Sequence, residues 1–275
     1  MRNLFFYALV LAALYLAAVY RSPAPVLVPP TGELDVRDLG SGAVPPPSVR
    51  DAVIHVQLGE ATSSSGTAFA VGPGQWMSAR HVVENCDRVF LLTENGNWRG
   101  GYVLAQTQIS GSSDLAILTA DWQKQAFPLA ATGDLQRNQS TFIVGFPQGK
   151  AGELHGKLLG RAQAVFAARR RMSEPVLVWA ETGRSGGFTG SVGGISGGPA
   201  FDAVGQVIGV AVAETMRRGR IYTAAPRSIT RAAANWDVVP QTTQTAGVFS
   251  RSNFEEQGNY LRAVGRVAQV VCVVD

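Results

Sequence analysis

Short apolar runs between turn-forming residues constrain the fold of this chain more than any other feature. From Asp51 onward, runs rich in Val, Ile, Leu and Ala recur at close spacing, with clusters of Gly, Pro, Ser and Asn between them. Examples are AVIHVQL, GTAFAVG, LAILTA, TFIVGF, VLVWAE and VIGVAVAE. The first good helical pattern after the amino terminus is SITRAAANW, at residues 228–236. The pattern predicts an all-β barrel or sandwich followed by a helix.

The amino terminus carries an export signal. An early Arg2 is followed by an uninterrupted apolar run from Leu4 to Tyr20, about 17 residues long, which is the lower limit for a membrane-spanning helix. No small-x-small cleavage site closes the run, because Ala18-Val19-Tyr20 ends in a bulky ring. Residues 1–21 are therefore expected to form an uncleaved transmembrane anchor, with a cleaved signal peptide as the alternative. Either places the rest of the chain outside the cytoplasm, in the periplasm or extracellular space, and the anchor would hold it to the inner membrane.

Residues 22–50 are dense in proline and cannot build a core, so they are expected to be an extended linker. Export would place the only two cysteines, Cys86 and Cys272, in an oxidising compartment. They form either a disulfide or two buried free thiols. The formal net charge is +4, and the basic residues are almost all arginine, with short clusters at residues 169–171 and 217–220 that lack interleaved aromatic residues. Nucleic-acid binding is therefore not expected.

Three segments carry residues of chemical interest. His81 ends the segment SARH, Asp114 lies in SDLAIL, and Ser196 lies in the glycine-rich turn GISGGP. Each alone has an ordinary structural explanation, since histidines occur at strand ends, aspartates in turns and Gly-Ser runs in loops. Their order along one chain, His then Asp then Ser, is the informative feature, because these residues form a catalytic triad when the fold brings them together.

In that order the segments resemble the trypsin/chymotrypsin-like serine peptidases, especially the bacterial high-temperature-requirement type. The resemblance extends from about residue 52 to 236 and includes VIGVAVAE after the nucleophile and GRIYTAAP before the helix. It implies two six-stranded antiparallel barrels with a C-terminal helix and an active site in the cleft between the barrels. The peptidase domain would span residues 51–237, residues 238–275 would form a C-terminal extension, and there is no recognisable PDZ domain.

The resemblance also assigns roles to the residues. Ser196 would be the nucleophile, His81 the general base and Asp114 the carboxylate that orients the imidazole. The backbone N–H groups of Gly194 and Ser196 would form the oxyanion hole. The substrate would be a protein or peptide.

The segment before Ser196 would shape the primary specificity pocket. Gly190 stands where trypsin has an aspartate at the pocket floor, so strict cleavage after Lys or Arg is not expected, and a small or medium apolar residue is the default. Arg220 would favour an acidic residue if it faced the pocket, although an exposed turn is its more ordinary position. The candidate pocket residues are Gly190, Ser191, Val212, Ala213, Glu214 and Arg220.

No cofactor and no metal site are expected. His55 lies in an alternating strand pattern, His155 is expected to be exposed, and neither has a cluster of histidines or cysteines nearby. Two alternatives remain open: a catalytically silent binding or scaffold module with the protease fold, and a viral or phage protease that processes its own precursor. The sequence does not indicate the oligomeric state.

Overall fold

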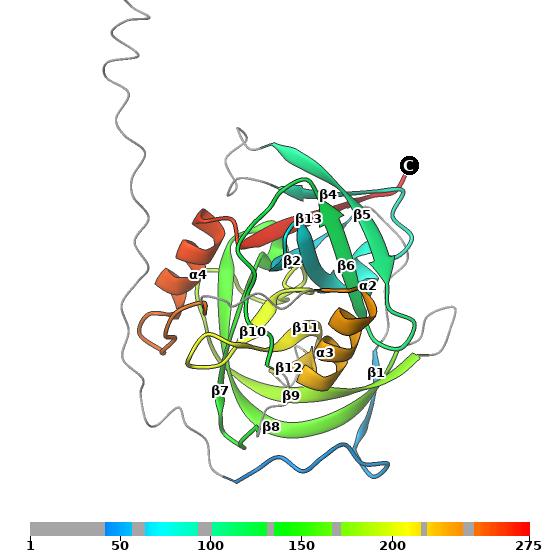
Figure 1. Ribbon diagram of the computed structural model, residues 1–275. Coiled ribbons are helices and arrows are strands. Elements are labelled where there is room, and N and C mark those ends of the chain that lie inside the picture. Colours follow the sequence, from blue (N-terminus) through cyan, green and yellow to red (C-terminus); the bar gives the residue numbers. More distant parts are fainter. Residues whose placement is uncertain are drawn as a thin grey trace, which may run out of the picture.

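The computed structural model describes residues 42–56, 64–92, 101–130, 135–166, 172–215, 219–238 and 245–275 (Figure 1). The predicted anchor at residues 1–21 and most of the predicted linker lie outside these residues. Within the described ranges, no helix has the length and apolar character needed to cross a membrane.

The first barrel is closed by six antiparallel strands in the order β13-β2-β3-β6-β5-β4. Its strands are β2 (Ser64–Gly72), β3 (Gln75–Ala79), β4 (Arg88–Leu92), β5 (Tyr102–Ile109), β6 (Leu115–Ala120) and β13 (Val267–Val273). Large apolar side chains on both faces of this sheet are almost completely buried, among them Phe69, Trp76, Met77, Leu91 and Ile117. Burying such side chains is the main driving force for closing the sheet.

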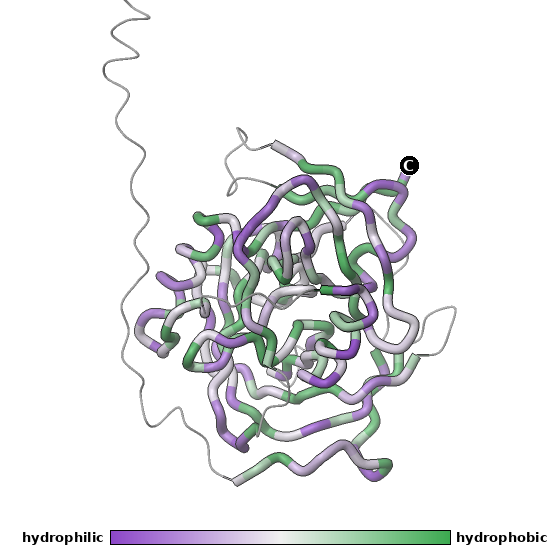
Figure 2. Tube along the Cα trace, viewed as in Figure 1, coloured by the Kyte–Doolittle hydropathy of each residue, from purple (hydrophilic) through white to green (hydrophobic). Residues whose placement is uncertain are grey.

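The second barrel closes through the pairing of β8 with β9, in the order β8-β7-β10-β11-β12-β9. Its strands are β7 (Ser140–Gly145), β8 (Gly152–Phe166), β9 (Met172–Arg184), β10 (Pro199–Phe201), β11 (Val207–Thr215) and β12 (Arg220–Ala224). Hydrophobic stretches recur along the strands of both barrels (Figure 2). The prediction of two six-stranded antiparallel barrels is confirmed.

Among the described helices, two longer ones follow the second barrel. Helix α3 (Pro226–Asn235) matches the helix predicted at residues 228–236 and begins with Pro226, whose missing N–H costs nothing at a helix start. It is not the C-terminal element, because α4 (Phe254–Ala263) and β13 follow it. The shorter helices described are α2 (Arg80–Val83) and the 3₁₀ turn η2 (Pro147–Gly149).

The first and last strands of the described chain pair with distant segments. Strand β1 (Val53–Val56), the first apolar run, pairs in parallel with the far end of β8 instead of entering the first barrel. The position between β2 and β4 is taken by β13, in which Val270 lies opposite Gly66 on one side and Leu91 on the other. The expected boundary at residue 237 is therefore wrong for this segment. The tail belongs to the first barrel because an apolar strand must pair its backbone groups.

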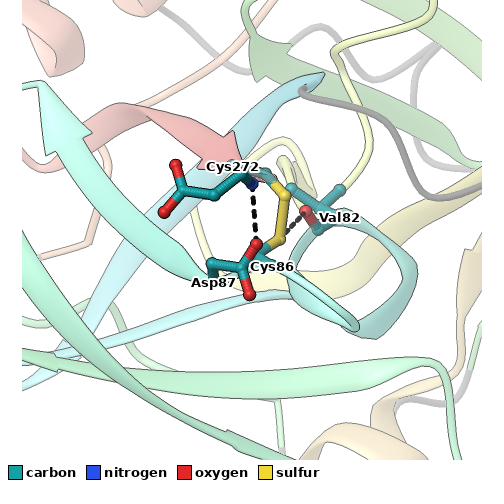
Figure 3. The surroundings of a disulfide bond; sticks show 5 residues. Val82, Cys86, Asp87 and Cys272 are labelled. Carbon is teal, nitrogen blue, oxygen red and sulfur yellow. Dashed lines mark hydrogen bonds between the residues drawn. A yellow bond between two sulfur atoms is a disulfide. The ribbon is translucent and has the colours of Figure 1, made fainter.

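A disulfide joins Cys86 and Cys272 (Figure 3). Cys86 lies three residues after the end of α2, and Cys272 lies on β13, so the bond fastens the tail to the segment that follows His81. Of the two alternatives left open by the sequence, the structure has the paired cysteines.

Removing this disulfide is expected to destabilise the protein strongly. The bond closes a loop with a sequence separation of 186 residues, for which the chain-entropy model gives a loss of roughly 5 kcal/mol in the free energy of unfolding. Guanidinium unfolding of wild type and the Cys86→Ser/Cys272→Ser double variant measures the difference. Equal unfolding midpoints for the two proteins, with equal slopes, would contradict the expectation.

Candidate active site

The structure brings His81 and Asp114 together. His81 is the second residue of α2, which follows β3 directly, and Asp114 directly precedes β6. The two strands are antiparallel neighbours in which Ala79 lies opposite Leu115. The carboxylate accepts hydrogen bonds from His81 Nδ1 at 2.6 Å and from the His81 backbone N–H at 3.0 Å. Arg80 N–H also donates to the Asp114 carbonyl at 3.2 Å. Three hydrogen bonds between two neighbouring segments thus set the orientation of the imidazole.

The pair has the electrostatics of a general base with its orienting carboxylate. Asp114 is buried, while the His81 side chain remains 19% exposed. Burial alone lowers the pKa of His81, but the charge of Asp114 and its hydrogen bond outweigh this effect and raise the pKa above its ordinary value. Because the carboxylate accepts, the proton of neutral His81 lies on Nδ1 and Nε2 keeps its lone pair.

The turn that carries Ser196 depends on glycine at two positions. Gly194 and Gly197 have φ angles of +95° and +85°, in the left-handed region that favours glycine. A Cβ at Gly194 would lie 2.5 Å from the Phe146 carbonyl oxygen, and one at Gly197 would lie 2.1 Å from the Thr67 carbonyl oxygen. Neither backbone atom can yield to a side chain. Glycine is therefore required at 194 for the turn to lie against Phe146, after β7, and at 197 for it to lie against β2 of the first barrel.

Ser196 lies at the boundary between the barrels, near the end of β3. Its carbonyl accepts a hydrogen bond from Thr67 N–H on β2 at 2.8 Å. The neighbouring Gly197 is so close to β3 that an added Cβ would be 2.8 Å from Ala79 N, two residues before His81. Within the described residues no hydrogen bond joins Ser196 Oγ to His81. Catalytic hydrogen bonds are often long before substrate binds.

The backbone around Ser196 leaves two N–H groups available. Ile195 N–H bonds the Val192 carbonyl, and Gly197 N–H bonds the Ala211 carbonyl. The N–H groups of Gly194 and Ser196, by contrast, donate to no acceptor in the described part of the chain. The Gly193 carbonyl accepts from Gln148 N–H at 2.5 Å, and in a trans peptide this directs the Gly194 N–H to the opposite side. These are the two groups that an oxyanion hole needs.

A pocket of about 450 Å³ lies beside the segment that precedes Ser196. Three of the predicted pocket residues line it, namely Gly190, Glu214 and Arg220, and the sequence did not single out Glu181 and Arg184. Ser191 lies next to it, where its hydroxyl donates to Glu214 Oε1 at 2.5 Å. The predicted Val212 and Ala213 are not among its lining residues.

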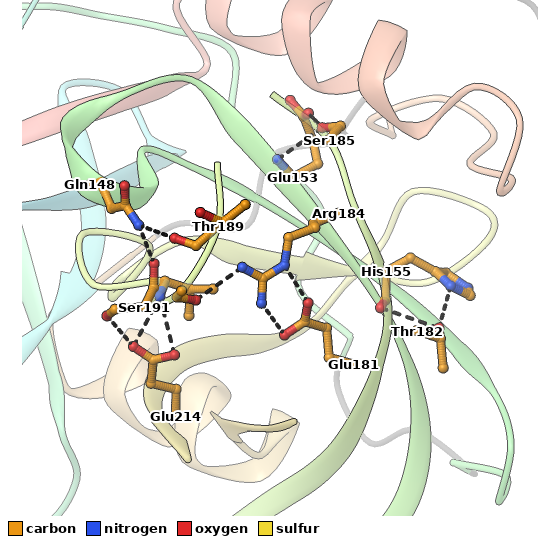
Figure 4. A network of polar contacts seen from close by, with 12 residues as sticks. Gln148, Glu153, His155, Glu181, Thr182, Arg184, Ser185, Thr189, Ser191 and Glu214 are labelled. Carbon is orange, nitrogen blue, oxygen red and sulfur yellow. Dashed lines mark hydrogen bonds and ion pairs between the residues drawn. The ribbon is translucent and has the colours of Figure 1, made fainter. Parts of the chain in front are cut away.

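Charged and polar side chains of this pocket form hydrogen bonds with the backbone of residues 189–192, the segment that leads to Ser196 (Figure 4). Arg184 makes two contacts with Glu181, at 2.5 and 2.8 Å, and donates to the Gly190 carbonyl at 3.0 Å. Glu214 accepts from Val192 N–H at 3.0 Å. Gln148 donates to two further carbonyls of the loop, at 2.7 and 2.8 Å. The residues that line the pocket are mostly polar or charged, and the preference for a small or medium apolar substrate residue stays a prediction.

The prediction that His155 is exposed is wrong. It lies on β8 with 1% of its surface exposed, and its ring packs against Phe142 and against Phe254 of α4. Its ring nitrogens lie 3.1 Å from Ser140 Oγ and 2.6 Å from Thr182 Oγ1. The two hydroxyl groups provide the hydrogen-bond partners that a buried polar ring needs. His55 lies on β1, where it pairs with Val165. No group of three potential metal ligands occurs among the described residues.

Solved protease structures share the fold of this chain. Two solved structures of the Rv3671c protease from M. tuberculosis match the fold. The active form has a TM-score of 0.52 at 16% identity and covers 75% of this chain and 99% of its own. An inactive mutant form has a TM-score of 0.51 at 17% identity, with 66% and 88% covered. At such identities they show the fold alone.

Among the curated proteins none matches the chain. The family model of the trypsin-like peptidase domain matches residues 66–210, which is more than half of the chain and includes His81, Asp114 and Ser196. Peptidases of this kind act on proteins or peptides. The chain belongs to the family of trypsin-like peptidases.

Proposed function

We propose that this protein is a serine endopeptidase that hydrolyses peptide bonds through an acyl-enzyme intermediate. The observation that carries the proposal is the bonded pair of His81 and Asp114 at the end of β3, beside the glycine turn of Ser196 with its two free N–H groups. A base, its orienting carboxylate, a serine and an anion site are the parts that acyl transfer requires.

Each group has one task in the proposed reaction. As Ser196 Oγ attacks the substrate carbonyl carbon, its proton passes to His81 Nε2, and Asp114 stabilises the imidazolium that forms. The oxyanion receives hydrogen bonds from the N–H groups of Gly194 and Ser196. When the C–N bond breaks, His81 returns the proton to the leaving amine. Water then attacks the acyl-enzyme with His81 as base, which releases the acid and restores Ser196.

We place this activity outside the cytoplasm, with the body held to the membrane by residues 1–21. The apolar run after Arg2 supports export. The Cys86–Cys272 disulfide supports it independently, because such bonds persist in oxidising compartments. Digestion by an added protease that cannot cross the inner membrane tests the location: we expect the body to be accessible in spheroplasts. Protection until the membrane is dissolved would contradict it.

Labelling with a fluorophosphonate tests the proposed function. The probe reacts with activated serines, so we expect one label per protein molecule, located on Ser196 by peptide mass spectrometry. The label should disappear in Ser196→Ala and remain in Ser252→Ala, which removes an exposed hydroxyl from the turn before α4.

Absent labelling of a folded wild-type protein would overturn the proposal and favour the catalytically silent scaffold. Unimpaired labelling of Ser196→Ala would also overturn it, because the reactive serine would then lie elsewhere. The self-processing alternative predicts internal cleavage of the expressed chain that Ser196→Ala abolishes.

A further inference from the structure

A buried carboxyl group from the second barrel lies directly behind the catalytic pair. Glu174 is on β9, with 1% of its surface exposed, and its Oε1 accepts a hydrogen bond from the Asp114 backbone N–H at 2.8 Å. Sixty residues separate the two along the chain. The contact therefore joins the second barrel to the strand end of the first barrel that presents Asp114.

No positive charge balances Glu174 among the described residues. Its Oε2 is buried and has no hydrogen-bond partner there. Arg80, which lies beside His81, has other partners: its guanidinium pairs with Glu84 at 2.5 Å and donates to the Ser110 carbonyl at 2.9 Å. An isolated buried carboxylate is very unfavourable, and such groups usually take up a proton instead.

The neighbouring carboxyl group decides where that proton lies. Two adjacent buried carboxyl groups resist double ionisation. Asp114 accepts two hydrogen bonds from His81, which stabilise its ionised form, whereas Glu174 accepts one. Burial, together with the charge of Asp114, raises the pKa of Glu174 to about 8. At neutral pH the proton is therefore on Glu174.

We propose that Glu174 is a positioning residue of the active site, a neutral carboxylic acid that holds the Asp114 backbone so that the Asp114 carboxylate faces His81. The inference rests on the proposed function, since it concerns the alignment of the same triad. This role also explains why an acid is buried at position 174, because an apolar side chain there would leave the Asp114 N–H without a hydrogen-bond acceptor.

If Glu174 must be neutral to hold Asp114 in place, the alignment of Asp114 with His81 depends on pH in the alkaline range. The charged or titratable groups around Glu174 are Asp114 and, beyond it, His81, Arg80 and Glu84. Loss of the Glu174 proton above about pH 8 places a second negative charge against Asp114. The pKa is higher in the folded state than the ordinary 4.5, so the folded state holds the proton more tightly and its stability falls as pH rises from 4.5 through about 8.

Two substitutions at this position separate the role from simple packing. Glu174→Gln keeps an oxygen for the Asp114 N–H and cannot ionise, whereas Glu174→Leu keeps the volume without an acceptor. For wild type we expect kcat/KM for a peptide substrate to fall above about pH 8. This decline should be absent in Glu174→Gln, which should retain neutral-pH turnover within about threefold. In Glu174→Leu, kcat should fall about tenfold or more with little change in KM, because the loss of a buried hydrogen-bond acceptor acts through Asp114.

A decline above pH 8 that persists unchanged in Glu174→Gln would overturn the inference, as would wild-type kcat in a folded Glu174→Leu. Infrared difference spectra of wild type against Glu174→Gln, both carrying Ser196→Ala, provide a readout that needs no activity. We expect a protonated carboxyl band at neutral pH that disappears near pH 8, and an ionised Glu174 at pH 7 would overturn the proposal. If Glu174 is protonated but the wild-type protein does not react with the fluorophosphonate, the proposed peptidase function is wrong and the protonation of Glu174 still stands.

Discussion

Replacing Ser196 with alanine is expected to lower kcat for peptide hydrolysis by about 10⁶-fold, the loss typical of removing the nucleophile from a serine-protease triad. The reason is chemical, since alanine has no hydroxyl group to attack the substrate carbonyl. KM should change little, because the pocket and the backbone donors remain. Steady-state cleavage of a peptide library by wild type and variant measures the effect and also identifies the preferred residue at the pocket.

Ser252→Ala is the matched control for this substitution and should cleave at the wild-type rate. A Ser196→Ala protein that retained more than about one hundredth of the wild-type kcat would mean that the hydrolysis does not proceed through this serine.

Deleting residues 264–275 is expected to abolish the folded state. The deletion removes β13 from between β2 and β4, which opens the first barrel and leaves two unpaired edges. It also removes the buried side chains of Val267 and Val270, each worth about 1.5–3 kcal/mol, and the disulfide worth roughly 5 kcal/mol. Together these losses are comparable to the total stability of about 5–15 kcal/mol that most domains have.

Circular dichroism and fluorophosphonate labelling of the truncated chain measure the effect of this deletion. Removing only residues 274–275 is the matched control, since it leaves β13 intact and costs one exposed ion pair between Arg88 and Asp275, which contributes little. Cooperative unfolding and labelling of the chain that lacks residues 264–275 would show that the first barrel does not depend on the tail.

The tail also reaches the loops of the active site. Arg262 on α4 is buried and forms an ion pair with Glu153 on β8, and it donates to the Gly145 carbonyl at the end of β7 at 3.3 Å. Glu153 in turn accepts a hydrogen bond from the Ser185 hydroxyl, at the start of the segment that leads to Ser196. Contacts from α4 thus reach, through Glu153, the segment that begins at Ser185 and leads to Ser196.

The pairing of His81 with Asp114 was predictable because the signals are local. His81, Asp114 and Ser196 each lie in a short segment whose residues match their strand end or turn. The short apolar runs predict a barrel or sandwich, and the resemblance to the serine peptidases implies the two six-stranded barrels. Glycine at 194 and 197 was equally visible, since a positive φ angle and close backbone contacts leave few alternatives.

Contacts between distant segments were not predictable in the same way. The run VAQVVCV predicts a strand, but nothing in it names β2 and β4 as its partners. Glu174 stands at the start of an ordinary strand, and only the packing of the two barrels places it against Asp114. His155 was mistaken for an exposed residue because its hydroxyl partners, Ser140 and Thr182, lie elsewhere in the sequence.

The central claim is that Ser196, His81 and two backbone N–H groups converge on one reacting carbonyl. A crystal structure of the intact protein after reaction with a phosphonate inhibitor measures this directly. We predict a covalent bond from Ser196 Oγ to phosphorus, one phosphonyl oxygen about 2.7–3.1 Å from the N–H groups of Gly194 and Ser196, and His81 still bonded to Asp114. A phosphonyl group on another residue, or one whose oxygen points away from both N–H groups, would contradict the account.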